Sequence, residues 1–248
     1  HLAHIVEMGL GPAANPALAS RAVRLAESPG PLAEKLISHY LDHNEYSEAL
    51  VWLEYSADAA ETLQAKDGYL QRMVALSLGP LDDVAGAIRA IERANSPAEL
   101  MLALIVHLAE QGEDGQVHEW LNRFVDVVGD EPRQVELLGD MFQKALHADG
   151  PTDLAKAVVA VSPNPKPLIE RLVGHYRREG DEQAELTWAE ELLAATPDAN
   201  AREAVIGRIV ELALGESSRP ESARAAISLS ATPNVYLDPL VALYAANK

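Results

Sequence analysis

The feature that most constrains this chain is a regular spacing of prolines in front of apolar, helix-like segments. Pro97, Pro132 and Pro167 stand at equal intervals in the sequence, and Pro31 opens an earlier segment of the same kind. Proline is favoured in the first turn of a helix, because the N–H that it lacks has no intrahelical partner there. After each proline, apolar residues recur at intervals of four and five, the inward stripe of an amphipathic helix. The spacing therefore predicts a helical repeat.

The segments that begin at Pro31 and Pro167 match each other best. Counted from each proline, the same residue types recur five, eight, nine and twenty-one positions on. The chain has only three tryptophans, so two of them in one register indicate a true structural repeat. The matched pairs are Leu36 and Leu172, His39 and His175, Tyr40 and Tyr176, and Trp52 and Trp188.

Helical patterning continues along most of the chain, in pairs of helices, and no alternating strand pattern is bounded by turns. We expect first helices over 31–43, 68–78, 97–111, 132–147, 167–179, 201–214 and 233–246. We expect second helices over 45–63, 81–94, 115–128, 151–161, 182–195 and 219–230. Turn-forming residues separate them at His43-Asn44, Gly79-Pro80, Gly112–Gly115, Asp149-Gly150-Pro151, Gly180-Asp181 and Arg219-Pro220.

The sequence therefore predicts an all-α fold with residues 1–248 as a single helical-repeat domain of about six to seven repeats. Because the chain begins at His1 without an initiating Met, we expect it to be a processed or excised part of a longer chain.

A helix–turn–helix unit with this spacing, about 34–35 residues long, resembles the tetratricopeptide repeat. With Pro31 as the second position of the unit, Leu36 stands at the family's seventh position, Tyr40 at the eleventh and Ala49 at the twentieth, where paired helices touch. Leu172 and Tyr176 match the same places in the later unit, which Pro197 closes.

Two further comparisons refine this resemblance. The run Ala49-x-x-Trp52-Leu53 resembles the Sel-like subclass of these repeats. Departures from the family pattern are Ile37 and Val173 at the eighth position and Glu185 at the twentieth. The resemblance implies a right-handed α-solenoid whose concave surface, lined by first helices, binds another protein without catalysis.

Charge and composition exclude several function classes. The chain has 38 acidic and 20 basic residues, a formal net charge of −18, which disfavours binding to nucleic acid or to anionic membrane surfaces. Its longest apolar stretches fall well short of the ~20 residues of a membrane-spanning helix. The absence of cysteine rules out disulfides, thiolate metal sites and a cysteine nucleophile, and it fits either a reducing or an oxidising compartment.

The patterns that could carry chemistry have simpler structural explanations. His39 and His43 share one predicted helix face, and Asp42 could join them around a metal, but no Glu follows His39 and packing beside Tyr40 is favoured. Acidic pairs fall mostly at predicted helix starts, where carboxylates cap free N–H groups, and Ser217-Ser218 is expected to cap the next helix. No phosphate-binding loop or Gly-x-Ser-x-Gly motif occurs. We therefore predict no catalytic residue, no cofactor and no metal.

Three residues are candidate partner contacts. Trp52 and Trp188 are expected in the core because they recur at a structural position, whereas Trp120 stands outside the register counted from Pro31 and is a candidate exposed residue. Arg177 and Arg178, near Arg171, could form a local anion-binding spot or place favourable cations at a helix C-terminus.

The leading functional hypothesis is a non-enzymatic scaffold that holds a partner enzyme or pore in a bacterial envelope assembly. It rests on the Sel-like resemblance, because such repeats serve exopolysaccharide export, and it implies a periplasmic location and a protein partner with basic segments. One alternative is a cytoplasmic peptide-binding adaptor or co-chaperone. A third hypothesis is an all-α glycan-processing enzyme.

Overall fold

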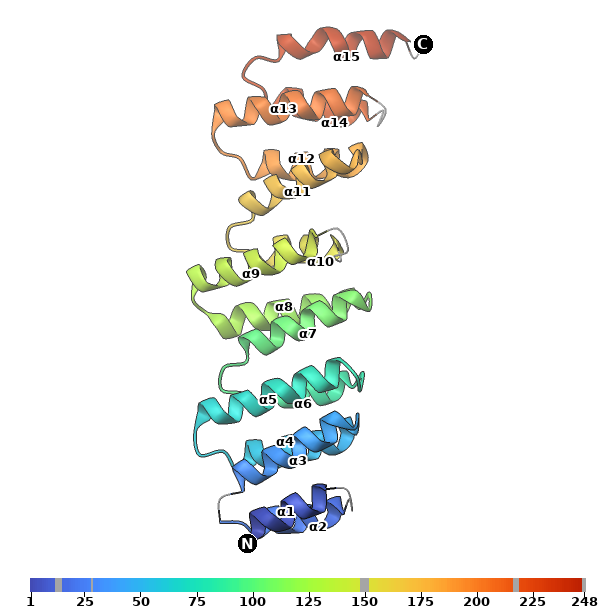
Figure 1. Cartoon of the computed structure of the whole chain (residues 1–248). Coiled ribbons are helices and arrows are strands. Elements are labelled where there is room, and N and C mark those ends of the chain that lie inside the picture. Colours follow the sequence, from blue (N-terminus) through green and yellow to red (C-terminus); the bar gives the residue numbers. More distant parts are fainter. Residues whose placement is uncertain (12–14, 28, 148–151, 216–218, 247–248) are drawn as a thin grey trace. The chain divides into compact units, whose positions relative to one another are not determined.

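The chain is all α-helical, as predicted. The computed structural model describes residues 1–11, 15–27, 29–147, 152–215 and 219–246, and those residues form 15 helices and no strand (Figure 1). The helices are α1 (Leu2–Leu10), α2 (Pro16–Arg24), α3 (Gly30–Asp42), α4 (Tyr46–Asp58), α5 (Leu63–Leu78), α6 (Val84–Arg93), α7 (Ala98–Glu110), α8 (Asp114–Val128), α9 (Glu131–Ala145), α10 (Thr152–Val161), α11 (Lys166–Glu179), α12 (Glu182–Ala194), α13 (Ala199–Leu214), α14 (Pro220–Ser228) and α15 (Asn234–Ala246).

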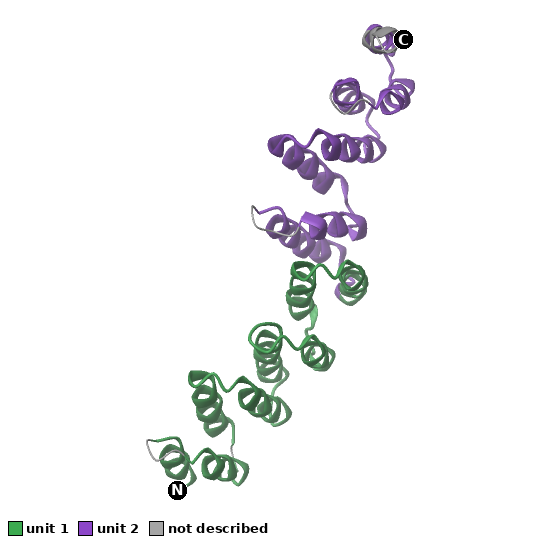
Figure 2. Ribbon diagram, turned by 90° about the vertical axis from the view of Figure 1, so that its right-hand side faces the viewer, with its two compact units in different colours: residues 1–127 green, residues 128–248 purple. Residues whose placement is uncertain are grey.

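These helices form two compact units, residues 1–127 and 128–248 (Figure 2). In unit 1, α1 packs on α2, α3 on α4 and α5 on α6, while α1 also meets α3, and α5 meets α4 and α7. In unit 2, α9 packs on α10, α11 on α12 and α13 on α14, while α13 also meets α12 and α15. Each unit is thus built from antiparallel helical hairpins, and the single domain over residues 1–248 stays a prediction.

Most predicted helices occur within a few residues of their expected bounds, with two exceptions. The first is α1 and α2, which lie before residue 31, where we predicted no helix. The second is the α4–α5 junction, where α4 ends at Asp58 and α5 already begins at Leu63. The Thr62 hydroxyl accepts a hydrogen bond from the N–H of Ala65 at 3.1 Å, so Thr62 is the N-cap that starts α5 early. The turn at Asp149-Gly150-Pro151 and the cap at Ser217-Ser218 lie outside the described residues.

The odd-numbered helices, which are the first helices of the hairpins, share one buried position that recurs at a constant step. The residue there is no more than 8% exposed in each of the odd-numbered helices from α3 to α15. The step between these positions is one residue shorter than the interval between the prolines. Its residues are Leu36, Leu70, Leu104, Leu138, Leu172, Ile206 and Leu240.

Two kinds of turn occur in the hairpins whose turns the structure describes, and they alternate from α1 to α8 and from α11 to α14. In α3–α4, α7–α8 and α11–α12, a residue at positive φ is followed by an N–H that donates to the carbonyl five positions back. In α1–α2, α5–α6 and α13–α14, the closing N–H donates to the carbonyl six positions back. The first kind of turn has Asn44, Gly112 and Gly180 at positive φ, and the second closes through Asn15, Asp83 and Arg219. The full repeat is therefore a double unit of two hairpins, and we call the equal separation of Asn44, Gly112 and Gly180 the double-repeat step.

The double repeat corrects our assignment of Trp120. The N-cap residues of α3, α7 and α11 are Pro29, Pro97 and Pro165, all in the same backbone conformation and separated by the double-repeat step. Pro97 is thus equivalent to Pro29 rather than to Pro31, so Trp120 stands in the same register as the other two tryptophans. It is only 4% exposed and is a core residue, not a surface contact.

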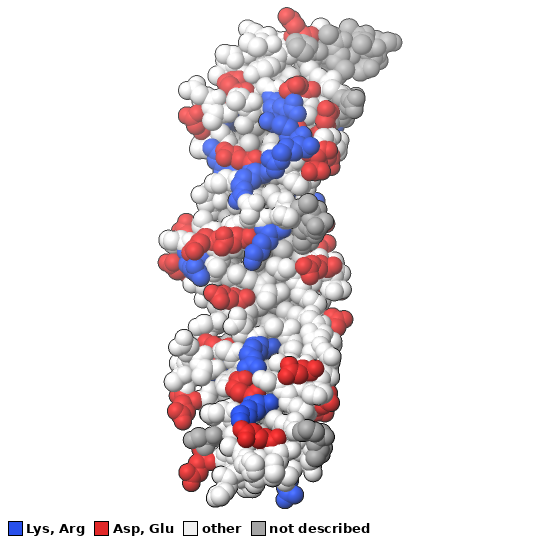
Figure 3. Space-filling view, in the orientation of Figure 1, with Lys and Arg blue, Asp and Glu red and all other residues white. Residues whose placement is uncertain are grey.

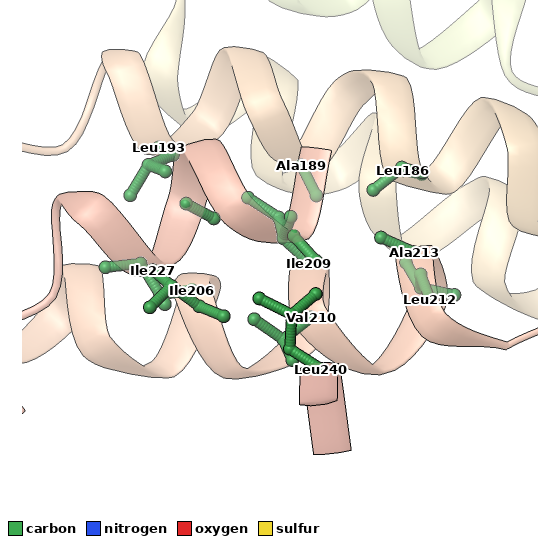
Figure 4. Packing of buried hydrophobic residues seen from close by; sticks show 12 residues of the cluster. Leu186, Ala189, Leu193, Ile206, Ile209, Val210, Leu212, Ala213, Ile227 and Leu240 are labelled. Atoms are coloured by element: carbon green, nitrogen blue, oxygen red, sulfur yellow. The ribbon is translucent and has the colours of Figure 1, made fainter. Parts of the chain in front are cut away.

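The other matched positions behave mostly as expected. Leu36, Tyr40, Ala49, Trp52, Leu172 and Tyr176 are all buried, whereas Trp188 is half-buried. In unit 2 the core joins α12, α13, α14 and α15 through aliphatic side chains such as Leu186, Ile209, Ile227 and Leu240 (Figure 4). Ala223 of α14 is fully buried in this core.

Carboxylates on two first helices hold the loops that lead to the next hairpin. In unit 1, Asp67 Oδ1 accepts from the N–H of Asn95 at 2.9 Å. In unit 2, Glu203 stands two double-repeat steps after Asp67 and accepts from the N–H of Ala231 and from the Ser230 hydroxyl. Burial tends to raise the pKa of Glu203, but these hydrogen bonds outweigh it and lower that pKa.

Candidate functional site

Two grooves open between neighbouring first helices of unit 1. The α1–α3 groove has a volume of about 460 Å³, and the α5–α7 groove about 380 Å³. Both fall in the size range of pockets that hold small ligands or single side chains. The α1–α3 groove is lined by Glu7, Leu10, Glu34, Lys35, Ser38, His39 and Asp42, and the α5–α7 groove by residues that include Val74, Ala75, Leu78, Glu99, Leu100, Ala103, Val106, His107 and Glu110.

The two grooves are the same place in successive double repeats. Three pairs of residues are separated by the double-repeat step and line the corresponding walls: Leu10 and Leu78, His39 and His107, and Asp42 and Glu110. His107 is therefore the partner in register of His39 and His175. One helix face of unit 1 thus presents a recurring groove.

One ion pair crosses the α1–α3 groove, and a second joins its α3 wall to α5. The Lys35 ammonium donates to Glu7 Oε1 at 2.6 Å, linking α3 to α1, and this contact lowers the pKa of Glu7. Arg72 of α5 donates through Nη1 to both carboxylate oxygens of Glu34, at 2.7 and 3.0 Å. These contacts fix the walls of the groove and leave Asp42 as an acid on its rim.

His39 of this groove makes local contacts with His43, which does not line the groove. The rings of His39 and His43 lie 4.3 Å apart, and His43 Nδ1 lies 2.7 Å from the carbonyl of His39. Across the described ranges of the chain, no three His, Asp or Glu side chains are grouped in a way that could hold a metal ion.

The α5–α7 groove has an apolar floor with a polar edge. Its floor is formed by aliphatic side chains of both helices, among them Leu78 and Val106. The His107 side chain is 13% exposed, and its Nε2 has no hydrogen-bond partner in the described part of the chain; Asp82 Oδ1 lies 3.6 Å away. Glu99 and Glu110 add negative charge to the lining. An aliphatic side chain with a cationic neighbour is the chemistry that complements such a groove.

At the third position of this register, in unit 2, the charge is inverted. Arg178 stands where the unit 1 grooves have Asp42 and Glu110, and Arg171 lies with its guanidinium carbon 5.1 Å from the centre of the Phe142 ring. Lys and Arg side chains gather over α11 to α13 (Figure 3). Arg177 and Arg178 are both exposed, but Arg177 donates through Nε to Glu185 at 2.8 Å and is partly engaged by the fold.

The acidic pairs singled out in the sequence act largely as helix caps. Asp83 accepts from the N–H of Gly86 at 2.9 Å, Asp130 from Arg133 at 3.2 Å and Asp181 from Ala184 at 3.0 Å. These carboxylates satisfy helix N-termini, as predicted.

Comparisons with known proteins give no additional information on these grooves. Neither the comparison with protein-family models nor that with curated proteins finds a match to this chain. Among the residues that the structure describes, no helix has the length and apolarity needed to cross a membrane.

Proposed function

We propose that this chain is a non-enzymatic interaction scaffold of the tetratricopeptide kind, which holds partner proteins by short segments laid across its first-helix face. The observation that supports this most is the recurrence of one groove in α1–α3 and α5–α7 at the double-repeat step. A periodic groove on rigid helices suits an extended segment, because side chains several residues apart along the segment can enter the two grooves.

The charge of the grooves supports a partner segment with basic residues. The formal net charge is −18, and each unit 1 groove has acidic side chains in its lining. Opposite charges on a partner would speed encounter and set orientation, while an aliphatic residue would fill the apolar floor. We propose Leu, Ile or Val flanked by Lys or Arg as the preferred segment.

The biological setting remains part of the proposal. The Sel-like resemblance favours a role in a bacterial envelope assembly, such as exopolysaccharide export, where the scaffold would hold an enzyme or a pore. A cytoplasmic peptide-binding adaptor would use the same grooves. The two settings differ in the partner and not in the chemistry of recognition.

The test compares peptide binding by the whole chain with that of a groove-blocked variant. The probes are labelled twelve-residue peptides with one central Leu and either Lys or Glu flanks. Ala103 is exposed in the α5–α7 groove, and Ala85 is exposed on the second helix α6, outside the grooves, so Ala103→Trp and Ala85→Trp form a matched pair. We expect the Lys-flanked peptide to bind the chain and Ala85→Trp alike, and Ala103→Trp at least about tenfold more weakly, a loss of about 1.4 kcal/mol.

The salt dependence of binding and the comparison of the two peptides show which results would contradict the proposal. Binding of the Lys-flanked peptide should weaken from about 0.05 to about 0.5 M salt, because screening shortens the range of the acidic surface. Equal binding of the Lys- and Glu-flanked peptides, or equal loss in both tryptophan variants, would rule out the groove as the binding site.

A further inference from the structure

A third cavity of unit 1 lies away from the two grooves, where α3, α4 and α5 meet. It has a volume of about 410 Å³ and is lined by residues that include Pro29, Pro31, Tyr55, Ser56, Ala59 and Tyr69. We call it the Ser56 pocket. It shares no lining residue with the α1–α3 or the α5–α7 groove.

The repeat register explains why a cavity exists here. Ser56 of α4 stands at the position that Phe124 occupies in α8 and Leu192 in α12, each one double-repeat step further on. Phe124 is fully buried and Leu192 is 8% exposed. A serine at a position that elsewhere holds a large apolar side chain leaves that volume unfilled.

Ser56 also places a hydroxyl group without a hydrogen-bond partner at the cavity. The residue is 3% exposed, and its Oγ has no hydrogen-bond partner in the described part of the chain. A buried hydroxyl without a partner is costly, and a ligand that offers an acceptor or a donor would recover that cost.

Two aromatic side chains of the lining, Tyr55 and Tyr69, are held in place by neighbouring residues. The Tyr55 ring makes an edge contact with Trp52 at 5.3 Å between centroids. Tyr69 lies against Glu34, which is itself held by the two contacts from Arg72. Burial, followed by the negative charge of Glu34 and its hydrogen bond, raises the pKa of Tyr69. Two aromatic rings in a lining that also contains proline and alanine complement a flat, largely apolar ligand.

We infer that the Ser56 pocket binds a phenol ring, with the ring between Tyr55 and Tyr69 and its hydroxyl at Ser56 Oγ. The ring occupies volume that Phe124 fills in its own repeat, and the hydroxyl supplies the partner that Ser56 lacks. The ligand is either a small free phenol or the side chain of a tyrosine on a partner. The site is independent of the proposed peptide grooves.

The experiment titrates the whole chain with p-cresol, toluene and N-acetyltyrosinamide and follows backbone amide NMR shifts. We expect saturable shifts at residues 55–69 with p-cresol. Ser56→Ala should weaken p-cresol by about 2- to 10-fold, the net worth of one hydrogen bond, and leave toluene unchanged. Saturation by N-acetyltyrosinamide identifies a tyrosine side chain as a ligand, and saturation by p-cresol alone identifies a small phenol.

Filling the pocket with a larger side chain can also be followed by thermal unfolding, which needs no ligand. Ser56→Phe and Ser56→Leu restore the residues of the other two repeats, so we expect at least one to raise the thermal midpoint and both to abolish saturable p-cresol binding. Ser38→Phe, at an exposed serine of the α1–α3 groove, is the control and should keep p-cresol binding. No saturable shift in the unmodified chain, or p-cresol binding that survives both filling variants, would overturn the proposal.

Discussion

The Glu185 carboxylate of α12 accepts two parallel hydrogen bonds from the Arg208 guanidinium of α13, from Nε to Oε1 at 2.8 Å and from Nη2 to Oε2 at 2.7 Å. Arg177 of α11 adds a third at 2.8 Å. Glu185 is 1% exposed and stands where α4 has Ala49 and α8 has Val117. The departure from the repeat pattern at this position is thus a buried ion pair that ties three helices of unit 2 together.

Removing one partner of this ion pair should lower the free energy of unfolding by more than removing both partners does. Arg208→Ala leaves the buried Glu185 carboxylate with Arg177 alone, and we expect a loss of about 3 kcal/mol in the free energy of unfolding. Urea unfolding measures it. The double variant with Glu185→Ala places the alanine of α4 at this position and should lose less than Arg208→Ala. A double variant less stable than Arg208→Ala would show that the pair stabilises the fold beyond satisfying its own charge.

The same pair predicts a dependence of stability on pH. Burial tends to raise the pKa of Glu185, but the hydrogen bonds and charges of Arg208 and Arg177 outweigh it and lower that pKa. A lowered folded-state pKa stabilises the fold above the unfolded value of about 4.3, and this contribution disappears as the pH falls through the folded value. The difference in unfolding free energy between the chain and Glu185→Gln should therefore be constant above about pH 5 and shrink below it. A difference that grows on acidification would reverse the assigned sign.

Trp120 and Trp188 should differ in their contribution to stability. Trp120 is 4% exposed, with the Arg123 guanidinium 4.2 Å from its ring centre, whereas Trp188 is half-buried. We expect Trp120→Ala to cost about 4 kcal/mol and Trp188→Ala less than about 2 kcal/mol, because a smaller cavity and less apolar area are involved. Urea unfolding gives both values, and equal losses would contradict the difference in burial.

A carboxylate at the position of Asp67 should stabilise the fold measurably only where the following loop offers it a free N–H donor. Asp67→Ala leaves the N–H of Asn95 without its partner, and we expect a loss of about 1.5 kcal/mol on urea unfolding. In the next double repeat Val135 stands at this position, and the residue that matches Asn95 is Pro163, which has no N–H. Ser96 is a second N–H donor to Asp67, but the matching N–H of Asn164 already donates to Ser162 Oγ at 3.3 Å. Val135→Asp should therefore gain less than about 0.5 kcal/mol. A larger gain would mean that the aspartate finds another donor.

Two glycines of the α7–α8 hairpin should respond in opposite directions to alanine. Gly112 has φ of +75°, a conformation that costs an L-residue about 1 kcal/mol, so Gly112→Ala should destabilise unit 1 by that amount. Gly115 lies inside α8 with open space at its Cβ position, so Gly115→Ala should stabilise by up to about 0.5 kcal/mol. Thermal unfolding of the two variants checks the signs, and a neutral Gly112→Ala would show that the turn can relax.

The sequence by itself determined the helical class, most of the helices and the caps that start them. These features depend on neighbours a few positions away, as Pro97 before α7 and Asp181 before α12 illustrate, and short-range rules are sufficient to recognise them. The tryptophan match between residues 52 and 188 was equally accessible, because it is a comparison of one segment with another.

Only the tertiary structure decided which prolines are equivalent, and with them the register of Trp120. That register is set by the two alternating kinds of turn, in which the closing N–H donates to the carbonyl five or six positions back. No local sequence pattern predicts these closing hydrogen bonds. The pairing of Glu185 with Arg208, the grooves beside His39 and His107 and the Ser56 pocket all lie between helices. They depend on how side chains from distant segments fill space together, which is why the sequence showed the residues without showing their contacts.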